Sequence, residues 1–152
     1  MPYELDDLDR KILEALQEDG RLSFRKIAER VDSTAVTVIN HVEDMEEAGV
    51  ISGYTVDLDY QELGFDVTAV IRIRVEGKRV KDIEDRLAEH DNVVAVYEVT
   101  GDTDILIITR FRNRKELGSF VIDKLAGRED IEETITHIAF DTYLERPHIP
   151  LE

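Results

Sequence analysis

Residues 23–50 read SFRKIAERVDSTAVTVINHVEDMEEAGV and carry the apolar spacing of a helix, a tight turn and a second helix. Ser23 is a suitable cap for the first of these helices, and the pair Asp32-Ser33 interrupts the pattern before the second begins near Thr34. The residues at helical spacing that we expect to be buried are Ile27, Ala28, Val31, Val38, Val42 and Met45. The segment therefore predicts a helix-turn-helix, a skeleton with which many proteins enter the major groove of DNA.

A helix before this segment and a short hairpin after it complete the first domain. The earlier helix starts behind an acidic pair and ends at Asp19-Gly20. Its apolar stripe consists of Leu8, Ile12, Leu13 and Leu16. The second helix of the helix-turn-helix ends at Ala48-Gly49. The alternation that follows predicts two short strands in residues 50–58. Three helices and a two-stranded wing make a winged helix-turn-helix.

The second half of the chain alternates between strand and helix patterns. The expected elements are a strand at 67–75, a helix at 78–90, strands at 93–100 and 104–111, a helix at 114–126 and a strand at 134–144. Too few residues separate the two middle strands for a crossover, so these strands should form a hairpin. The resulting order, βαββαβ, is that of the ferredoxin-like fold, and the whole chain is expected to be of the α+β class.

The first strand of this sheet has two distinct faces. Ala69, Ile71, Ile73 and Val75 share one face, and Val70, Arg72 and Arg74 share the other. Helices on one side of a four-stranded sheet leave its second face open, and pairing with the same face of a second copy would bury it. We therefore expect a homodimer, in which the two arginines meet acids such as Glu98 or Asp141.

The charge balance is strongly acidic. The 152 residues include 35 acidic and 19 basic side chains, for a net charge of −16. Such a surface resembles that of proteins from extreme halophiles, where salt screens charge within about 3 Å, although an ordinary acidic protein is the alternative. The chain lacks cysteine, which excludes disulfides and thiolate metal sites, and it shows neither a signal region nor an apolar run long enough for a membrane. We expect a cytoplasmic protein with no membrane partner.

Polar residues of the second helix of the helix-turn-helix are the candidates for reading base edges. These residues are Thr34, Thr37, Asn40 and His41. Ser33 lies where the helix N-terminus can approach a phosphate. Basic residues at and before the first helix can clamp phosphates, namely Arg21, Arg25 and Lys26, with Arg30 behind them. However, residues 34–50 contain no Lys or Arg, and residues 1–60 hold 15 acids and 6 bases. The long-range electrostatic interaction with DNA should therefore be repulsive at low salt.

Several short motifs together resemble the Lrp/AsnC family of feast/famine transcription regulators. The matching pieces are LDDLDRKIL at 5–13, DGR at 19–21, IAERV at 27–31, GVISGY at 49–54 and VTGDTD at 99–104. The resemblance covers essentially the whole chain. It implies a winged-helix reader of double-stranded DNA joined to an effector-binding domain, assembled as dimers or as tetramers and octamers, and responding to an amino acid. The domains are then expected at 1–60 and 67–146, with a linker at 61–66 and a tail at 147–152.

The resemblance also implies where an effector binds, at the loop of the predicted hairpin and on the last strand. The corresponding residues are Tyr97, Thr100, Gly101, Asp102, Asp104, Thr134 and Thr136. Gly101 lets backbone N–H groups approach a carboxylate, and Asp102 or Asp104 can pair with an ammonium group. The alternative is that Gly101 and Asp102 form an ordinary turn, and that the two threonines lie on a solvated strand face.

The chain departs from the family in its recognition helix. The family usually carries arginines at positions 40–46, where this chain reads NHVEDME. Two alternatives to DNA binding therefore stay open, a winged helix that serves only as a protein-interaction module and a sensor that co-assembles with related regulators. Asn40 and His41 are then only solvated surface residues.

Catalysis is not expected. Some siroheme decarboxylases resemble this family in architecture, but the histidines His41, His90, His137 and His148 are scattered and show no paired spacing for a metal. No phosphate-binding glycine loop or nucleophile elbow is present in the sequence. We predict no catalytic residue, no metal site and no cofactor apart from an amino-acid effector.

Overall fold

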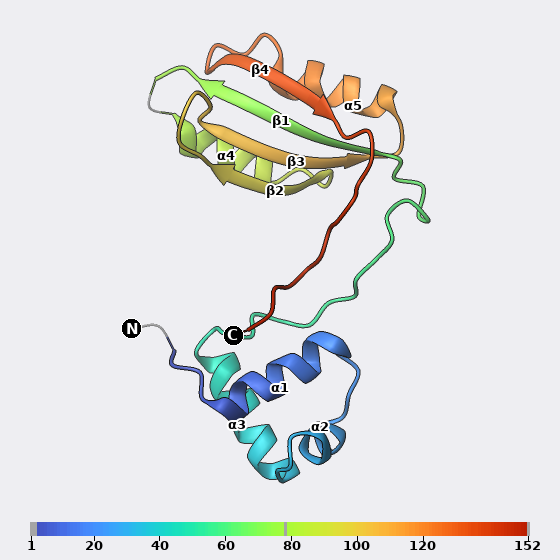
Figure 1. The fold of residues 1–152 in the computed structure, drawn as a ribbon. Coiled ribbons are helices and arrows are strands. Elements are labelled where there is room, and N and C mark those ends of the chain that lie inside the picture. The colour runs from blue at the N-terminus through green and yellow to red at the C-terminus, as the bar shows by residue number, and fades with distance from the viewer. Residues whose placement is uncertain (1–2, 78, 152) are drawn as a thin grey trace. The chain divides into compact units, whose positions relative to one another are not determined.

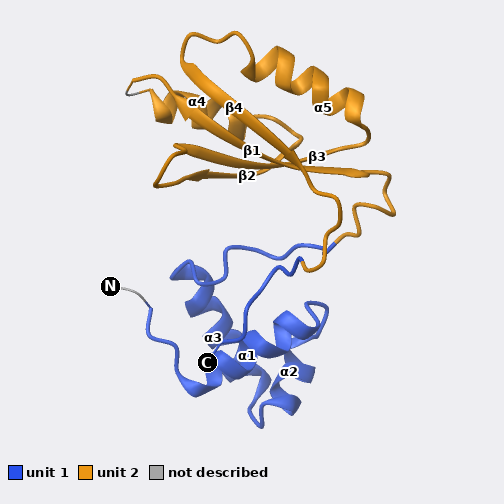
Figure 2. Cartoon of the chain, turned by 45° about the horizontal axis from the view of Figure 1, so that its top comes forward, with its two compact units in different colours: residues 1–57, 145–152 blue, residues 58–144 orange. Residues whose placement is uncertain are grey.

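The computed structural model describes residues 3–77 and 79–151, which fall into two compact units. Unit 1 comprises residues 1–57 and 145–152, and unit 2 comprises residues 58–144 (Figure 2). Among the described residues, no helix combines the length and the apolar character that a membrane span requires. Each unit has its own apolar core.

Unit 1 is built from three helices whose starts are set by side-chain caps. The helices are α1 (Asp7–Glu18), α2 (Phe24–Arg30) and α3 (Ala35–Glu47) (Figure 1). Asp6, Ser23 and Thr34 occupy the cap positions, and the side chain of each accepts a hydrogen bond from the backbone N–H three residues later. Such caps satisfy N–H groups that the helix itself leaves unpaired. The helix starts that the sequence predicted at Ser23 and Thr34 are confirmed.

The core of unit 1 holds the two helices of the helix-turn-helix against α1. Its buried residues are Ile12, Ala15, Ile27, Ala28, Val38, Val42 and Met45. The turn between α2 and α3 passes through Asp32, which has a left-handed φ of 55°, and the Ser33 N–H closes the turn on the Ala28 carbonyl at 2.9 Å. After α3, Gly49 has a φ of 73°, and the Val50 N–H donates to the Met45 carbonyl at 2.8 Å. The predicted core residues of α2 and α3 are buried, except Val31, which is half-buried.

The expected two-stranded wing is wrong as a pair of strands. Residues 50–58 contain no strand, and Val56 and Leu58 are exposed. The segment is held to α3 by the Tyr54 hydroxyl, which donates to Glu46 Oε1 at 2.8 Å. A single pair of short strands is marginally stable in water, so alternation alone was not enough to pair them.

Unit 2 is a four-stranded antiparallel sheet in the order β2-β3-β1-β4 (Figure 1). Its elements are β1 (Val67–Val75), α4 (Val80–Ala88), β2 (Val93–Glu98), β3 (Ile105–Phe111), α5 (Arg114–Phe120), η1 (Val121–Leu125) and β4 (Ile131–Ile138). This is the predicted βαββαβ order. The bounds of several elements differ from expectation by a few residues. The largest differences are that the last helix changes to a π-helical turn at Val121 and that β4 spans Ile131–Ile138 rather than residues 134–144. Lys78, in the predicted first helix of this unit, lies outside the described residues.

The helices of unit 2 cover one face of the sheet. In β1, buried residues alternate with half-buried ones, and the buried set packs with Ile83, Leu87, Leu117, Phe120 and Leu125 of the helical layer. The other face is open, as predicted. Residues opposite each other in the register lie on one face, so Val70, Arg72, Leu106, Ile108 and Ile135 share the open face.

The chain enters and leaves the sheet through two different kinds of segment. Residues 60–64 form a turn that overlaps the linker predicted at 61–66 and lies against the end of β3. There the Arg110 guanidinium lies 4.2 Å from the Tyr60 ring centre, and Arg112 Nη1 donates to the Leu63 carbonyl at 3.0 Å. Residues 139–151, after β4, contain no helix or strand. Phe140 and Tyr143 in this segment are fully exposed.

Candidate functional site

Some of the residues predicted to read base edges lie on the outward face of α3, where they are accessible to solvent. Asn40 is exposed, and Thr37 is half-buried one turn before it. Val36, which the sequence analysis did not select, is 68% exposed on the first turn. An apolar side chain there can contact a thymine methyl group. Val36 lies outside the spacing of the buried residues 38, 42 and 45, and this could have predicted its exposure from the sequence. Beyond Asn40 this helix presents only carboxylates to solvent, at positions 43, 44, 46 and 47.

The first turn of α3 is held by its own hydroxyl groups. Thr34 Oγ1 accepts from the Thr37 N–H at 3.2 Å and lies 2.8 Å from Thr37 Oγ1. Ser33 is half-buried, and its N–H is used inside the preceding turn. Both threonine hydroxyls therefore have an internal partner, which fixes their positions at the start of the helix.

The basic residues around α2 are exposed, as a phosphate contact requires, but they differ in pairing. Arg25 Nε lies 3.2 Å from Glu29 Oε1, and Arg30 is paired with Glu18. Within residues 3–77 and 79–151, Arg21 and Lys26 have no carboxylate partner for their side chains. Exposed pairs such as Arg25 with Glu29 contribute little free energy, so Arg25 can exchange its carboxylate for a phosphate.

His41 has a different environment from the one expected. Its Nδ1 lies 2.7 Å from Asp9 Oδ1 and 4.0 Å from Asp6 Oδ2, and its side chain is 25% exposed. Asp9 is only 2% exposed. His41 therefore joins α3 to the start of α1. Its place on the helix predicted a base contact, and the partner carboxylate is not apparent from local pattern because it lies 32 positions earlier in the chain.

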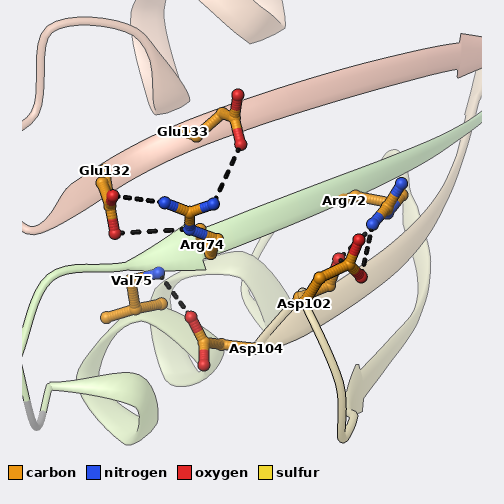
Figure 3. Close-up of polar contacts among 8 residues, drawn as sticks. Arg72, Arg74, Val75, Asp102, Asp104, Glu132 and Glu133 are labelled. Carbon is orange, nitrogen blue, oxygen red and sulfur yellow. Dashed lines mark hydrogen bonds and ion pairs between the residues drawn. The ribbon is translucent and has the colours of Figure 1, made fainter.

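In unit 2 the predicted effector loop is fastened to β1 (Figure 3). Arg72 Nε donates to Thr103 Oγ1 at 2.9 Å, and Arg72 Nη2 donates to Asp102 Oδ1 at 2.6 Å. Asp104 Oδ2 accepts from the Val75 N–H at 2.8 Å. Asp104 thus holds the strand end, whereas Asp102, whose side chain is 83% exposed, stays accessible to a ligand.

Arg72 and Thr103 belong to this site although the sequence analysis did not assign them to it. The Arg72 guanidinium donates a hydrogen bond to Asp102 and attracts its charge, which lowers the pKa of Asp102 below its ordinary value. The contacts of Arg72 and Arg74 with Glu98 or Asp141 that we expect in a dimer stay a prediction, and within one chain the two arginines have other partners. Arg74 instead pairs with Glu132 and lies 3.6 Å from Glu133, on the neighbouring strand (Figure 3).

The seven predicted effector residues do not form one cluster within a single chain. Thr100, Gly101 and Asp102 are exposed in the hairpin loop, where Gly101 has a φ of 118°. Tyr97 pairs with Leu106 and so lies on the open face of the sheet. Thr134 and Thr136 pair with Ile73 and Ile71, which places them on the helix-covered face and on the far edge strand. One copy alone does not bring the two threonines to the loop, and both are half-buried on this edge strand.

Comparison with known proteins matches both units. Residues 5–52 match a family model described as winged helix-turn-helix DNA-binding, and residues 68–149 match the Lrp/AsnC ligand binding domain. An HTH-type transcriptional regulator of Pyrococcus furiosus is 43% identical over 142 residues, which span 93% of this chain and 95% of that protein. The regulator FL11 of the same organism is 32% identical over 148 residues, which span 97% of each chain.

Solved structures agree with these sequence matches. The structure of E. coli AsnC superposes with a TM-score of 0.89 at 31% identity and covers 95% of this chain and 97% of that chain. A regulator from Neisseria meningitidis, solved as an L-Met complex, has the same fold, with a TM-score of 0.89 at 24% identity and 97% coverage of each chain. The fold and the matches define a helix-turn-helix transcriptional regulator with a ligand-binding domain, and not an enzyme. The chain belongs to the Lrp/AsnC family.

The Arg72 contact can be tested through the titration of Asp102. Asp102 should titrate below pH 3.8, and Arg72→Gln should bring its pKa back toward that ordinary value. Because the folded-state pKa is the lower one, the pair stabilises the fold above about pH 4, and this contribution is lost as the pH falls through the folded-state pKa. Carboxyl-carbon NMR through an acid titration measures the shift. Arg114→Gln is the control, and an Asp102 titration unchanged by Arg72→Gln would refute the contact.

Proposed function

We propose that the chain binds specific DNA sites through α3 and regulates transcription in response to an amino acid bound at the hairpin loop. The observation that carries the DNA part is the outward face of α3, where Val36, Thr37 and Asn40 are presented by a capped helix in a helix-turn-helix. Asn40 can bond adenine with both atoms of its amide, and the two neighbouring residues can contact thymine methyl groups. A regulator of this kind works beside the chromosome, which supports a cytoplasmic location.

The few cations of unit 1 suit a supporting role in phosphate contact. Arg21, Arg25 and Lys26 are exposed at and before α2, the helix that crosses the backbone in this motif. With 15 acids against 6 bases in residues 1–60, long-range charge opposes binding at low salt. At molar salt the repulsion is screened within about 3 Å, and shape, hydrogen bonds and two linked half-sites supply the affinity. The halophilic setting suggested by the composition fits this scheme.

An effector site at the loop has the polar groups that an amino acid needs. Asp102 is exposed and ionised, and Gly101 lets backbone N–H groups approach a carboxylate. The Neisseria regulator was solved as a complex with L-Met, and L-methionine is therefore a suitable first probe for this chain. Thr134 and Thr136 take part only if a second copy brings its last strand to the loop.

A homodimer follows from the open sheet face. Val70, Leu106, Ile108 and Ile135 place apolar surface on that face. Arg72 and Arg74 on the same face are already neutralised by carboxylates of their own chain. A second copy would cover this face and present two α3 helices to half-sites about one helical turn of DNA apart. Tetramers and octamers remain extensions of the same proposal.

One alternative function has its own observation. The second half of α3 exposes Glu43, Asp44, Glu46 and Glu47 and no cation. Carboxylates repel phosphates and suit a surface that contacts a basic partner. The second candidate is therefore a co-regulator that assembles with related regulators without contacting DNA itself.

Footprinting at low and molar KCl on fragments upstream of the chain's own gene separates the two functions. We expect protection at molar KCl. Asn40→Ala should reduce discrimination between matched and mismatched sites by about 1–3 kcal/mol, because it removes a base contact. Lys26→Gln should weaken binding to all sequences alike, and Lys81→Gln in unit 2 is its control. Absence of protection at both salts would favour the co-regulator.

Titration calorimetry with L-methionine tests the effector site on the full chain. Asp102→Asn should weaken binding at least about tenfold, because it removes the charge that pairs with the ammonium group. Asp85→Asn, an equally conservative change on the exposed side of α4, should leave binding unchanged. Equal affinities of the Asp102→Asn variant and the unaltered chain would remove the loop from the proposal.

Light scattering during size-exclusion chromatography tests the dimer. The unaltered chain should elute at about twice the 17.5 kDa of one chain. Ile108→Glu places a charge on the open face and should shift the mass toward the monomer. Ile122→Glu makes the same kind of change at a side chain on η1 that is 68% exposed, and it should leave the dimer intact. A dimer that survives Ile108→Glu would place the interface elsewhere.

A further inference from the structure

Three metal-ligating side chains from two helices meet in unit 1. They are Asp6 and Asp9 at the start of α1 and His41 of α3, and one ligand atom of each lies within 4.8 Å of the other two. The Asp9 carboxylate is 2% exposed and the His41 side chain is 25% exposed. The group combines a nearly buried carboxylate, an imidazole and an accessible second carboxylate, which differs from a patch of surface acids.

Helix capping uses only one oxygen of each carboxylate. Asp6 Oδ1 accepts from the Asp9 N–H at 2.7 Å, and Asp9 Oδ2 accepts from the Asp6 N–H at 3.0 Å. The second oxygens, Asp6 Oδ2 and Asp9 Oδ1, are the ones that lie 4.0 Å and 2.7 Å from His41 Nδ1. The capping box therefore orients the two carboxylates and leaves one oxygen of each toward the imidazole.

The charges around the group favour a cation. Asp9 also shares a side-chain hydrogen bond with Tyr3, and the negative charges of Asp6, Asp9 and Asp44 all act on that phenol. Arg10, a basic residue whose charge acts on Asp6, is paired with Asp7 at 3.3 Å. The positive end of the α1 dipole opposes a cation, but it amounts to about half a charge against two carboxylates.

We propose that Asp6, Asp9 and His41 bind a divalent transition-metal ion, with Zn²⁺ and Co²⁺ as representatives of the class. One imidazole nitrogen and two carboxylate oxygens are donors that such ions accept. Around an ion with bonds of about 2.1 Å, neighbouring ligand atoms lie about 3.0–3.4 Å apart. The distances of 2.7 and 4.0 Å from His41 Nδ1 bracket that range, so small side-chain rotations complete the site.

Coordination through His41 Nδ1 requires that nitrogen to be free of a proton, which a neutral imidazole achieves by carrying its single proton on Nε2. Because metal ligands must be deprotonated to bind, metal affinity should fall as the pH is lowered. The bound ion would fasten α3 to the start of α1 more firmly than the hydrogen bond does. Paired histidine spacing is absent from the sequence, and the three ligands at positions 6, 9 and 41 come together only in the fold.

Two variants separate coordination from ordinary folding roles. His41→Arg keeps a positive partner for Asp9 but cannot ligate a metal. Asp6→Ser keeps a good N-cap for α1 but removes a carboxylate ligand. His148→Arg makes the same change at a histidine of the tail, outside the group, and serves as the matched control.

The experiment is titration of the metal-free full chain with Zn²⁺ by calorimetry and with Co²⁺ by visible absorption, in molar KCl at two pH values. We expect one ion per chain, affinity about 10–100-fold lower in His41→Arg and in Asp6→Ser, and no change in His148→Arg. Circular dichroism shows whether each variant is folded. Binding that is absent from the unaltered chain, or that is equal in His41→Arg, overturns the proposal. These readouts use no DNA and no amino acid, so they are independent of the proposed function.

Discussion

Positive charge is scarce in this chain, and the placement of its arginines decides what each surface can bind. There are 19 basic side chains for 35 acidic ones. In unit 1, Arg10, Arg25 and Arg30 are each paired with a carboxylate of the chain itself. A helix-turn-helix with so few available cations cannot depend on phosphate attraction alone, so the proposed contact with DNA would rest mainly on the shape of α3 and its polar face.

Salt acts differently on the exposed and the buried ion pairs. The pair of Arg25 with Glu29 is exposed on both sides and is screened at high ionic strength. The contact of His41 with Asp9 involves a carboxylate that is almost fully removed from solvent, and screening affects it far less. In concentrated salt, therefore, the apolar core and this contact hold α3 on α1, whereas the exposed ion pairs contribute less to stability.

The sequence predicted those features that depend on local pattern. Capped helix starts at Ser23 and Thr34, the strand at 67–75 and the βαββαβ order all follow from spacing and turn chemistry, and each is present. It did not predict the partner of His41 or that of Arg72, because both contacts join residues about 30 positions apart. The prediction of two paired strands in residues 50–58 was wrong for a related reason, because the pairing of strands depends on neighbours that alternation does not reveal.

Register explains why the candidate effector residues were harder to place than the fold. Alternation in β4 fixes that Thr134 and Thr136 share a face, but only the pairing with Ile73 and Ile71 shows which face it is. A shift of one residue would have moved both threonines to the open side. The loop residues, by contrast, follow from the short connection between β2 and β3, and they were found at the expected place.

Arg72 connects the loop to the face proposed for dimerisation. Its backbone lies between Leu106 and Ile135 in the register of the open face, and its guanidinium reaches Asp102 and Thr103 of the loop. A ligand whose ammonium group competes for Asp102 would release a guanidinium beside that apolar surface. An unpaired charge there disfavours close packing, whereas the paired state permits it. Ligand binding and assembly would then be coupled through one ion pair, and the coupling would act equally in both directions.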